Sequence, residues 1–304
     1  MGIVVFGAVF VDVKGYPEAQ YIPGGRNVGK VIQVHGGVSR NIVEDIANIG
    51  LRPTFVSVVD DSGLSIDVIE KLKRHHVETK YITTAPDGLG TWLAVFDNNG
   101  DVVASISKRP DLSGINITLD LHGDEIFRKA HSAVVEIDME KDSLDRIYAF
   151  AEKYSIPVFA AVSNMSIAME RREYLNKTAC IVCNDQEAGM LFSEEFENVP
   201  RSTLPSLLLR KIRQAGISKM VVTLGEKGAI YADAEGDHGY VPPQKVDVID
   251  TTGAGDAFFS GTAVGLTYGK TLRESCEIGT RLASAVIATK DSCCPRFKPA
   301  EFGL

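Results

Sequence analysis

The sequence has no cluster of basic residues and no long apolar run. Its formal charge is −8, from 32 Lys and Arg against 40 Asp and Glu, which argues against nucleic acids or anionic membranes as partners. No window approaches the roughly 20 apolar residues that span a bilayer. The apolar stretch 2–13 lacks a basic flank and meets Asp12 at once, so we interpret it as a strand rather than a signal peptide. We expect a soluble, cytoplasmic protein.

Cysteine is also scarce, with five residues in 304. An odd count in such a chain indicates reduced thiols. Cys180 and Cys183 have CxxC spacing but lie in a short apolar run typical of a strand, where residues three apart point to opposite faces. No second pair has a spacing that would complete a zinc site. The cysteines therefore predict neither a metal nor a redox role.

No linker rich in Pro, Ser or Gly divides the chain, and 44% of its residues are hydrophobic. We therefore predict one domain over residues 1–304. Short apolar runs alternate with segments of helical periodicity, which predicts an α/β fold with a mostly parallel sheet covered by helices on both faces. The predicted strands are 3–6, 54–58, 133–137, 158–161, 179–183 and 220–223, and the clearest helical periods run over 42–49, 66–72 and 144–150.

Two regions break this alternation. Residues 14–35 are polar and Gly-rich without helical period, and residues 91–106 read as a hairpin around Asn99-Gly100. Inside the first region, residues 24–30 fit the GxxxxGK pattern of a P-loop. Val31 stands where Ser or Thr should hold magnesium, and no strand-to-helix context surrounds the pattern. We reject the P-loop and predict a polar surface segment.

The most informative stretch is 250–261, which reads Asp-Thr-Thr-Gly-Ala-Gly-Asp-Ala-Phe-Phe-Ser-Gly. Gly253, Ala254 and Gly255 come just before an apolar run that reads as a helix. Small residues there leave backbone N–H groups open to an anion. Asp256 in the first turn would then take a proton from a hydroxyl that attacks a bound phosphate. From the residues alone, a Gly-rich turn with a dipole-stabilising Asp explains the pattern equally well.

This stretch resembles the C-terminal signature of the ribokinase-like (PfkB) carbohydrate and nucleoside kinases. The resemblance implies that Gly253, Ala254 and Gly255 form an anion hole and that Asp256 is the catalytic base. It also implies a ribokinase-like three-layer α/β/α fold with a small β-sheet lid, formed here by about 13–35 and 88–110. In the family this lid closes over the sugar and often forms a dimer contact, so a homodimer through the lid is expected.

The N-terminal signature of the family is similar to Gly36-Gly37-Val-Ser-Arg-Asn41. By resemblance, Gly36 and Gly37 let the backbone approach sugar hydroxyls, and Asn41 binds one of them. Asp12, at the end of the first predicted strand, matches the acidic residue that accepts hydrogen bonds from two neighbouring hydroxyls, which suits its two acceptor oxygens. From the residues alone, a strand-end turn former is the favoured interpretation of Asp12.

The ATP site is implied by two further motifs. Asn184 and Glu187 fit the family's Asn-x-x-Glu motif, which organises Mg²⁺ and its waters beside the ATP phosphates. The same spacing forms a helix capping box, and both roles can hold at once. Thr223, Gly225 and Gly228 resemble the turn that admits the nucleotide phosphates at a strand end. The implied cofactors are ATP and Mg²⁺.

A monovalent-cation site is the least certain implication. Asp250 and Thr252, with the loop 289–294, map onto the site that holds this ion, such as K⁺, in many relatives. There the sequence departs from the family, because it reads Lys-Asp-Ser-Cys-Cys-Pro over 290–295 where relatives show Gly-Ala and a small polar residue. K⁺ activation and the adenine contact are the two open points.

The substrate is indicated by a finer resemblance. Arg40 directly before Asn41, and the run 90–95, are most similar to the pseudouridine kinases of this family. They imply phosphorylation of the 5′-hydroxyl of pseudouridine, with Arg40 among the substrate-binding residues. Another nucleoside, or a free sugar such as ribose, fructose or 2-keto-3-deoxygluconate, is the alternative.

The lid should then contact the uracil edge, and His35, Trp92 and Lys108 are candidates by location. A non-catalytic sugar or nucleotide sensor is an answer of a different class. Against it stands the presence of Asp256, Asn184 and Glu187 together. A dehydrogenase is disfavoured because no strand–GxGxxG–helix unit is present.

Overall fold

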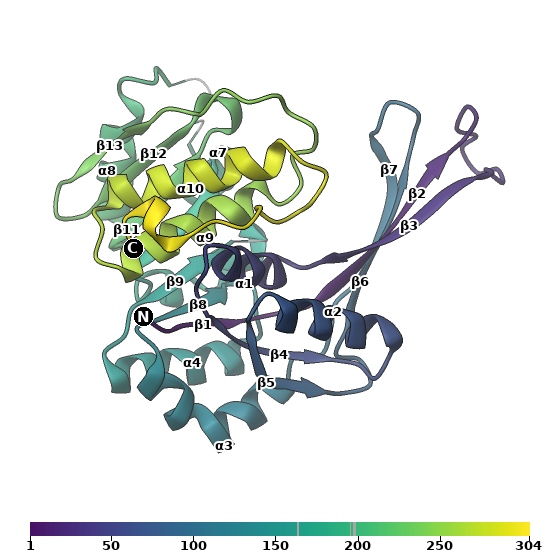
Figure 1. Ribbon diagram of the computed structural model, residues 1–304. Coiled ribbons are helices and arrows are strands. Elements are labelled where there is room, and N and C mark those ends of the chain that lie inside the picture. The colour runs from purple at the N-terminus through teal and green to yellow at the C-terminus, as the bar shows by residue number, and fades with distance from the viewer. Residues whose placement is uncertain (163, 195, 197–198) are drawn as a thin grey trace.

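The computed structural model describes residues 1–162, 164–194, 196 and 199–304. Across them, strands form a nine-stranded sheet in the order β13-β12-β11-β10-β9-β8-β1-β4-β5 and a four-stranded sheet in the order β3-β2-β6-β7 (Figure 1). The strands of the large sheet are β1 (Ile3–Phe6), β4 (Thr54–Val59), β5 (Glu78–Thr84), β8 (Ser132–Glu136), β9 (Val158–Ala161), β10 (Cys180–Asn184), β11 (Lys219–Thr223), β12 (Ala229–Asp233) and β13 (His238–Val241). The six predicted strands are thereby confirmed. β5, β12 and β13 were not predicted.

The helices cover both faces of the large sheet (Figure 1). They are α1 (Val38–Asn48), α2 (Gly63–Arg74), α3 (Gly114–Lys129), α4 (Lys141–Tyr154), α5 (Met165–Glu170), α6 (Arg172–Leu175), α7 (Asp185–Phe192), α8 (Leu204–Ala215), α9 (Ala254–Thr267) and α10 (Leu272–Ile287), with 3₁₀ turns η1 (Gly225–Lys227) and η2 (Pro299–Phe302). The three helical periods found in the sequence correspond to α1, α2 and α4.

Alternation along the buried strands explains the three layers. In β1, Val4 and Phe6 pack into a core with α3 to α8, while Ile3 and Val5 pack into a second core with α1, α2, α9 and α10. Successive strand residues point to opposite faces, and a strand covered on both faces must be apolar throughout. The predicted three-layer α/β/α fold is confirmed.

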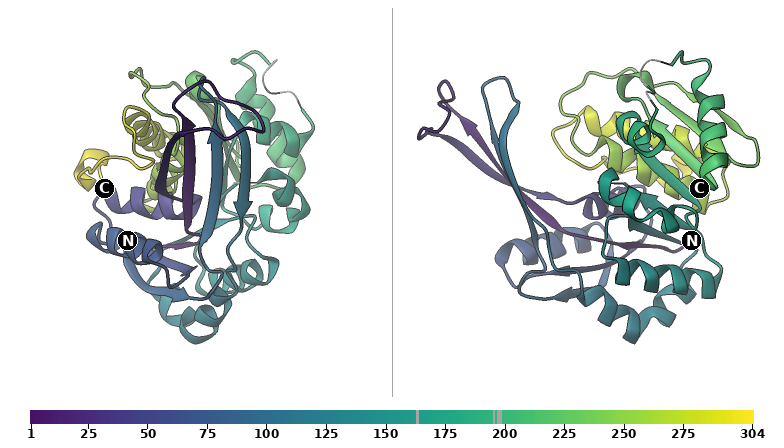
Figure 2. Two further views of the ribbon diagram at one scale, coloured as in Figure 1. Left: turned by 90° about the vertical axis from the view of Figure 1, so that its right-hand side faces the viewer. Right: turned by 180° about the vertical axis from the view of Figure 1, so that it is seen from behind.

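The small sheet extends away from the large one (Figure 2). It consists of β2 (Phe10–Pro17), β3 (Gly29–Gly36), β6 (Gly90–Phe96) and β7 (Val102–Lys108). β2 pairs antiparallel with β3 and parallel with β6. The hairpin over 91–106 is confirmed, but the single strand expected over 2–13 is wrong. The chain forms β1, breaks, and starts β2 at Phe10, because an apolar run carries no mark of where it changes sheets.

Two features that we rejected as functional motifs have structural roles. The P-loop-like residues 24–30 lie in an exposed loop and lead into a strand, β3, rather than a helix. Cys180 and Cys183 point to opposite faces of β10, into separate cores. All five cysteines are buried and free of disulfides.

The order of the strands determines where a cleft can form. The chain runs from β1 to β4 and β5 on one side, then returns through α3 to β8 on the other side of β1. In parallel α/β sheets, ligands bind beyond the carboxyl ends of the strands at such a reversal. Within the described residues, no helix is long and apolar enough to cross a membrane.

Candidate active site

A cavity of about 370 Å³ lies at the reversal between β1 and β8, beneath the small sheet. It brings together five of the predicted residues: Asp12 and Trp92 from the small sheet, Gly37 and Asn41 from the start of α1, and Asp256 from α9. The remaining lining comes from Ala8, Phe10, Val38, Ser107, Arg109, Pro110, Leu112, Glu136, Asp138, Met139, Glu140 and Asn164. Segments far apart in the sequence therefore converge on one cleft.

The amino end of α9 has the geometry of an anion site. Gly253 caps the helix with a φ of 82°, and a Cβ placed on it would lie 2.0 Å from the Ser292 carbonyl oxygen. Only glycine fits there. In the described part of the chain, the N–H groups of Gly255 and Asp256 have no acceptor. Such unpaired first-turn donors, with the helix dipole, attract a negatively charged group.

Asp256 is partly buried at the end of this turn. Its Oδ2 accepts a hydrogen bond of 2.7 Å from Nδ2 of Asn41. Burial raises the pKa of Asp256 to about 6, against the hydrogen bond from Asn41 and the charge of Arg40, which act to lower it. A carboxylate whose pKa lies just below neutrality is ionised at neutral pH and still basic enough to accept a proton.

Asp12 lies within β2 rather than at the end of β1, which corrects the expected position. Its register partner in β6 is Trp92, so both side chains face the cavity. Burial raises the pKa of Asp12, while Lys14 and Arg40 act to lower it. A Cβ at Gly36 would lie 2.4 Å from Oδ1 of Asp12. Gly36 thus makes room for this carboxylate.

The sequence reasoning missed a set of charged residues in the cleft. Glu136 ends β8, Asp138 and Glu140 follow it, and Nη2 of Arg109 lies 3.4 Å from Oδ2 of Asp138. Oε1 of Glu136 accepts the Ser39 N–H at 3.0 Å, and burial, with the charge of Asp138, raises the pKa of Glu136 to about 7. Acidic residues at alternate positions directly after a predicted buried strand were the available signal.

Four predicted substrate contacts do not line this cavity, namely Gly36, Arg40, His35 and Lys108. The side chain of Arg40 is 1% exposed and points away into the protein. His35 pairs with Asp67 at 3.0 Å, and Lys108 pairs with Asp87 at 2.8 Å. Of the candidates for the uracil edge, only Trp92 lines the cleft. Location in the sequence alone could not tell which face of a lid strand each residue occupies.

The predicted nucleotide residues lie further along the same edge of the large sheet. Asn184 and Thr223 are register partners at the carboxyl ends of β10 and β11, and the turn η1 from Gly225 to Gly228 follows. Asn184 and Glu187 form the capping box, with both reciprocal bonds at 2.8 Å. The structural role of the pair is confirmed, and its role toward Mg²⁺ stays a prediction.

The residues expected at the monovalent cation also lie together. The N–H groups of Ile249 and Asp250 donate to the Ile287 carbonyl, and Thr252 N–H donates to Oδ1 of Asp250 at 2.8 Å. Burial would raise the pKa of Asp250, but the hydrogen bonds from Thr252 outweigh it and lower that pKa. Among the described residues, no group of three or more His, Cys, Asp or Glu side chains could hold a metal. A K⁺ site therefore stays a prediction.

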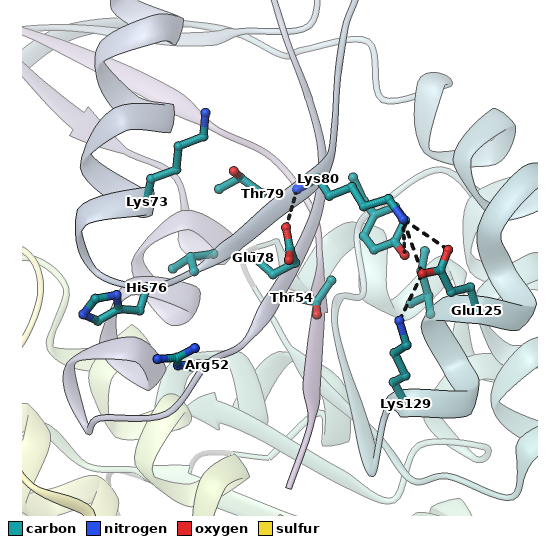
Figure 3. A pocket seen from close by; sticks show the side chains of 12 residues that line it. Arg52, Thr54, Lys73, His76, Glu78, Thr79, Lys80, Glu125 and Lys129 are labelled. Carbon is teal, nitrogen blue, oxygen red and sulfur yellow. Dashed lines mark hydrogen bonds and ion pairs between the residues drawn. The ribbon is translucent and has the colours of Figure 1, made fainter.

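Two larger cavities lie elsewhere. One of about 680 Å³ borders the open edge of the large sheet at β5, and there Glu125 binds both Lys80 and Lys129 (Figure 3). None of the predicted site residues lines it. The other, of about 580 Å³, lies between β3, α1, α2 and the loop 289–296. Volume alone therefore does not select a candidate active site, and the convergence of Asp12, Asn41 and Asp256 makes the smaller cleft the candidate.

Comparison with known proteins assigns this arrangement to a family. A model of the pfkB family of carbohydrate kinases matches residues 2–296. The chain belongs to this family. The guanosine-inosine kinase of Exiguobacterium acetylicum is 30% identical over 292 residues, which cover 95% of this chain and 95% of that protein. A pseudouridine kinase of Escherichia coli is 25% identical, over 94% of this chain and 90% of that protein.

The fold is shared with solved ribokinases. The structure of Arabidopsis thaliana ribokinase complexed with ribose and ATP matches with a TM-score of 0.83 at 19% identity, over 99% of this chain and 97% of that one. The predicted ribokinase-like fold is thus confirmed. The pfkB protein described here is a sugar or nucleoside kinase, and the choice of acceptor depends on the cleft.

Proposed function

We propose that this pfkB kinase transfers the γ-phosphoryl group of ATP to the 5′-hydroxyl of a ribonucleoside. The observation that carries the proposal is the mixed lining of the cleft. Asp12, Asn41 and Asp256 suit a sugar with hydroxyl groups. Trp92 and Met139 line the same cleft and offer flat or flexible apolar surfaces of the kind on which a nucleobase stacks. A free pentose would leave these apolar surfaces unused.

The cleft also has hydrogen-bonding groups that could recognise the nucleobase. Arg109 offers donors, and Asp138 and Glu140 offer acceptors. A nucleobase edge with a ring N–H beside a carbonyl could donate to one of these carboxylates and accept from Arg109. Guanine, hypoxanthine and the pseudouridine base all have such an edge. With the 30% identical guanosine-inosine kinase, this favours guanosine or inosine as the acceptor.

The chemistry follows from the residues around α9. Asp256 takes the proton of the 5′-hydroxyl as that oxygen attacks the γ-phosphorus. The amides of Gly255 and Asp256, unpaired among the described residues, hold the phosphoryl oxygens, as preorganised donors do for charge that develops in a transition state, whereas the Ala254 N–H already donates to the Thr251 carbonyl. Asp12 orients the sugar through two hydroxyls. Removing the substrate from water beneath the small sheet keeps water from taking the phosphoryl group.

Magnesium would be held through water by Glu187. Its Oε2 already accepts the Asn184 N–H, while Oε1 has no partner among the described residues and can accept from a metal-bound water. Burial raises the pKa of Glu187 above its ordinary value, against the backbone hydrogen bond. Bound in this way, Mg²⁺ would neutralise phosphate charge beside the nucleotide turn.

The proposal is tested by ADP release with ATP and Mg²⁺. Guanosine, inosine, pseudouridine, uridine, adenosine and ribose are compared as acceptors under identical conditions. We expect kcat/KM for guanosine or inosine to exceed that for ribose by at least about tenfold, since stacking of one base contributes about 1–3 kcal/mol. Preference for ribose or another free sugar would overturn the nucleoside assignment and leave Asp256 as the base.

Pseudouridine is the second candidate. It is supported by the similarity of the Arg40–Asn41 motif to pseudouridine kinases and by the 25% identical enzyme of E. coli. Because Arg40 does not face the cleft, the motif supports this acceptor less directly than a substrate contact would. A clear preference for pseudouridine over guanosine and inosine in the same assay would decide for it.

We also propose that two copies pair through the outer face of the small sheet. Val31, Leu93 and Ile106 share the face opposite Asp12, and they are 69%, 41% and 70% exposed. An apolar sheet face of this kind is typical of a protein interface. Light scattering should give twice the chain mass for the wild type and the monomer mass for Ile106→Lys. A monomeric wild type would contradict the pairing.

A further inference from the structure

Arg40 is the largest fully buried side chain among the described residues. The proposed function gives this side chain no direct contact with substrate. Its guanidinium donates to two backbone carbonyls at the end of β3, with Nε 3.2 Å from the Gly36 oxygen and Nη2 bonded to the His35 oxygen. On the other side it reaches the loop 289–294, where Nη2 lies 3.3 Å from Oγ of Ser292 and Nη1 lies 3.3 Å from Sγ of Cys293. Arg40 therefore links α1 to the end of β3 and to the loop 289–294.

The contact with Ser292 continues to the proposed base. Ser292 Oγ donates to Oδ1 of Asn41 at 3.4 Å, and Nδ2 of Asn41 donates to Asp256 at 2.7 Å. In this series of hydrogen bonds, which runs from Arg40 through Ser292 and Asn41 to Asp256, each donor faces an acceptor. Hydrogen bonds in series polarise one another. The Ser292 hydroxyl thereby fixes which end of the Asn41 amide faces the carboxylate.

The same loop also supports the anion hole. The Ser292 carbonyl oxygen lies against Gly253, at the point where a Cβ would come within 2.0 Å. Movement of Ser292 would therefore disturb the cap of α9 as well as Asn41. The base and the anion hole therefore both contact the loop 289–294, and Arg40 binds this loop through Ser292 and Cys293.

The guanidinium is itself fixed by a buried ion pair. Oε2 of Glu44 lies 3.1 Å from Nη1 of Arg40, and Oε1 of Glu44 lies 2.8 Å from Nζ of Lys71. Burial alone would raise the pKa of Glu44, but the charges of Arg40 and Lys71 outweigh it and lower that pKa. Within the described residues, Lys71 forms no hydrogen bond with Ser292, so a substitution of Lys71 serves as a control.

We propose that Arg40 is a positioning residue of the kinase: through Ser292 it orients Asn41 toward Asp256 and holds the loop 289–294 against the cap of α9. This role rests on the proposed function, because it assumes that Asp256 is the base. It replaces the direct substrate contact that the sequence motif implied. A residue with this role affects turnover rather than substrate affinity, since it touches the reacting groups only through others.

The test is chemical rescue of Arg40→Ala. The cavity of about 580 Å³ is lined by His35, Glu44, Ser292 and Cys293, which are all partners of Arg40, so a guanidinium ion has a route to the vacated position. We expect kcat to fall by about 10- to 100-fold, the loss typical of a small misplacement of catalytic groups, with KM for nucleoside and ATP changed less than threefold. Added guanidinium should restore part of kcat, and neutral urea at the same concentration should not.

Three variants and two controls make the outcome decisive. Ser292→Ala should lower kcat without response to guanidinium, whereas Lys71→Met should leave kcat near wild type. If Arg40→Ala does not fold, Arg40→Met/Glu44→Gln removes both buried charges and should show the same fall in kcat. An Arg40 variant with normal kcat, or with only a raised nucleoside KM, would overturn the proposal. Wild type and Asp256→Asn in the same assay separate this failure from failure of the proposed function.

Hydrogen exchange gives an outcome that needs no substrate. The amides of Ala254 and Ala257, which donate to the Thr251 and Gly253 carbonyls, and the amides of 289–294 should exchange faster in Arg40→Ala than in the wild type, and guanidinium should slow them again. Lys71→Met should exchange as the wild type does. Unchanged exchange in a folded Arg40 variant would contradict the positioning role whichever acceptor the enzyme uses.

Discussion

The catalytic end of the cleft and the small sheet above it are built on opposite principles. Around Asp256, polar side chains are linked to one another: Asn41 donates to the carboxylate, and Ser292 donates to Asn41. In the small sheet, every residue of β7 is exposed, and apolar side chains such as Ile106 face solvent. The first region has one arrangement available to it. The second can change its side chains at little cost to the fold.

This difference separates chemistry from choice of substrate. Phosphoryl transfer needs atoms held within a fraction of an ångström, and the frame of α1, α9 and the loop 289–294 supplies that rigidity. The acceptor is recognised where strands of the small sheet meet the acidic residues after β8. Substitutions in the frame should therefore lower kcat, and substitutions in the small sheet should change KM.

The largest effect is expected from Asp256→Asn. Loss of a general base lowers the rate by about 10²- to 10⁴-fold, which the ADP-release assay measures. The pKa of Asp256 in the folded protein, about 6, lies above the ordinary value of 3.8, so ionisation of this carboxyl opposes folding. The contribution of Asp256 to the free energy of unfolding therefore falls as the pH rises from about 3.8 to about 6. Thermal stability at neutral pH should therefore not decrease. A variant with normal turnover would refute the assignment.

Gly253→Ala should lower the rate less than Asp256→Asn does, and it should also lower the stability of the fold. The new Cβ would meet the Ser292 carbonyl oxygen, and such overpacking costs about 1–3 kcal/mol. Gly269→Ala is the matched control, since Gly269 has a similar positive φ of 76° and no atom near the position of a Cβ. The control should lose about 1 kcal/mol to backbone strain alone. Equal losses of stability and activity in the two variants would contradict the close contact.

The small sheet is tested by neighbouring residues on opposite faces of β6. Trp92→Ala should raise KM for the nucleoside about tenfold through lost stacking while kcat changes little. Leu93→Ala, on the outer face, should leave KM unchanged. A large fall in kcat for Trp92→Ala would mean that the small sheet takes part in the chemistry.

The smallest predicted effect is a shift in pH dependence. Asn41→Ala removes the hydrogen bond that lowers the pKa of Asp256, so the acid limb of kcat/KM should move to higher pH. The measurement is a pH profile of the variant beside the wild type. A limb displaced to lower pH would contradict the role of Asn41 toward the carboxylate.

Much of this arrangement was predictable because it is local in sequence. The run from Asp250 to Gly261 contains the cap, the first turn and the apolar face of α9, so helix physics allows an anion site there, and the family resemblance favoured that site over a plain Gly-rich turn. Buried parallel strands are likewise predictable, because each one is a short apolar run in the sequence. The large sheet and the amino end of α9 follow from such patterns.

What the sequence did not show depends on contacts between distant segments. Arg40 and Ser292 are 252 positions apart, and nothing in the motif around Arg40 indicates that its side chain turns away from the cleft. The residues alone did not indicate β3, because most of them are exposed and lack an apolar period, and only the family resemblance implied a small sheet over about 13–35. Glu136 and Asp138 enter the cleft only because β8 lies next to β1.

The most direct test of the central claim is the pH dependence of kcat/KM in the wild type, in Glu136→Gln and in Asp256→Asn. Glu136 is included because its pKa, about 7, could also produce an acid limb. The account predicts that wild type and Glu136→Gln lose activity as the pH falls through about 6, and that the residual activity of Asp256→Asn lacks this limb. A limb that persists in Asp256→Asn, or that disappears in Glu136→Gln, would show that another group is the base.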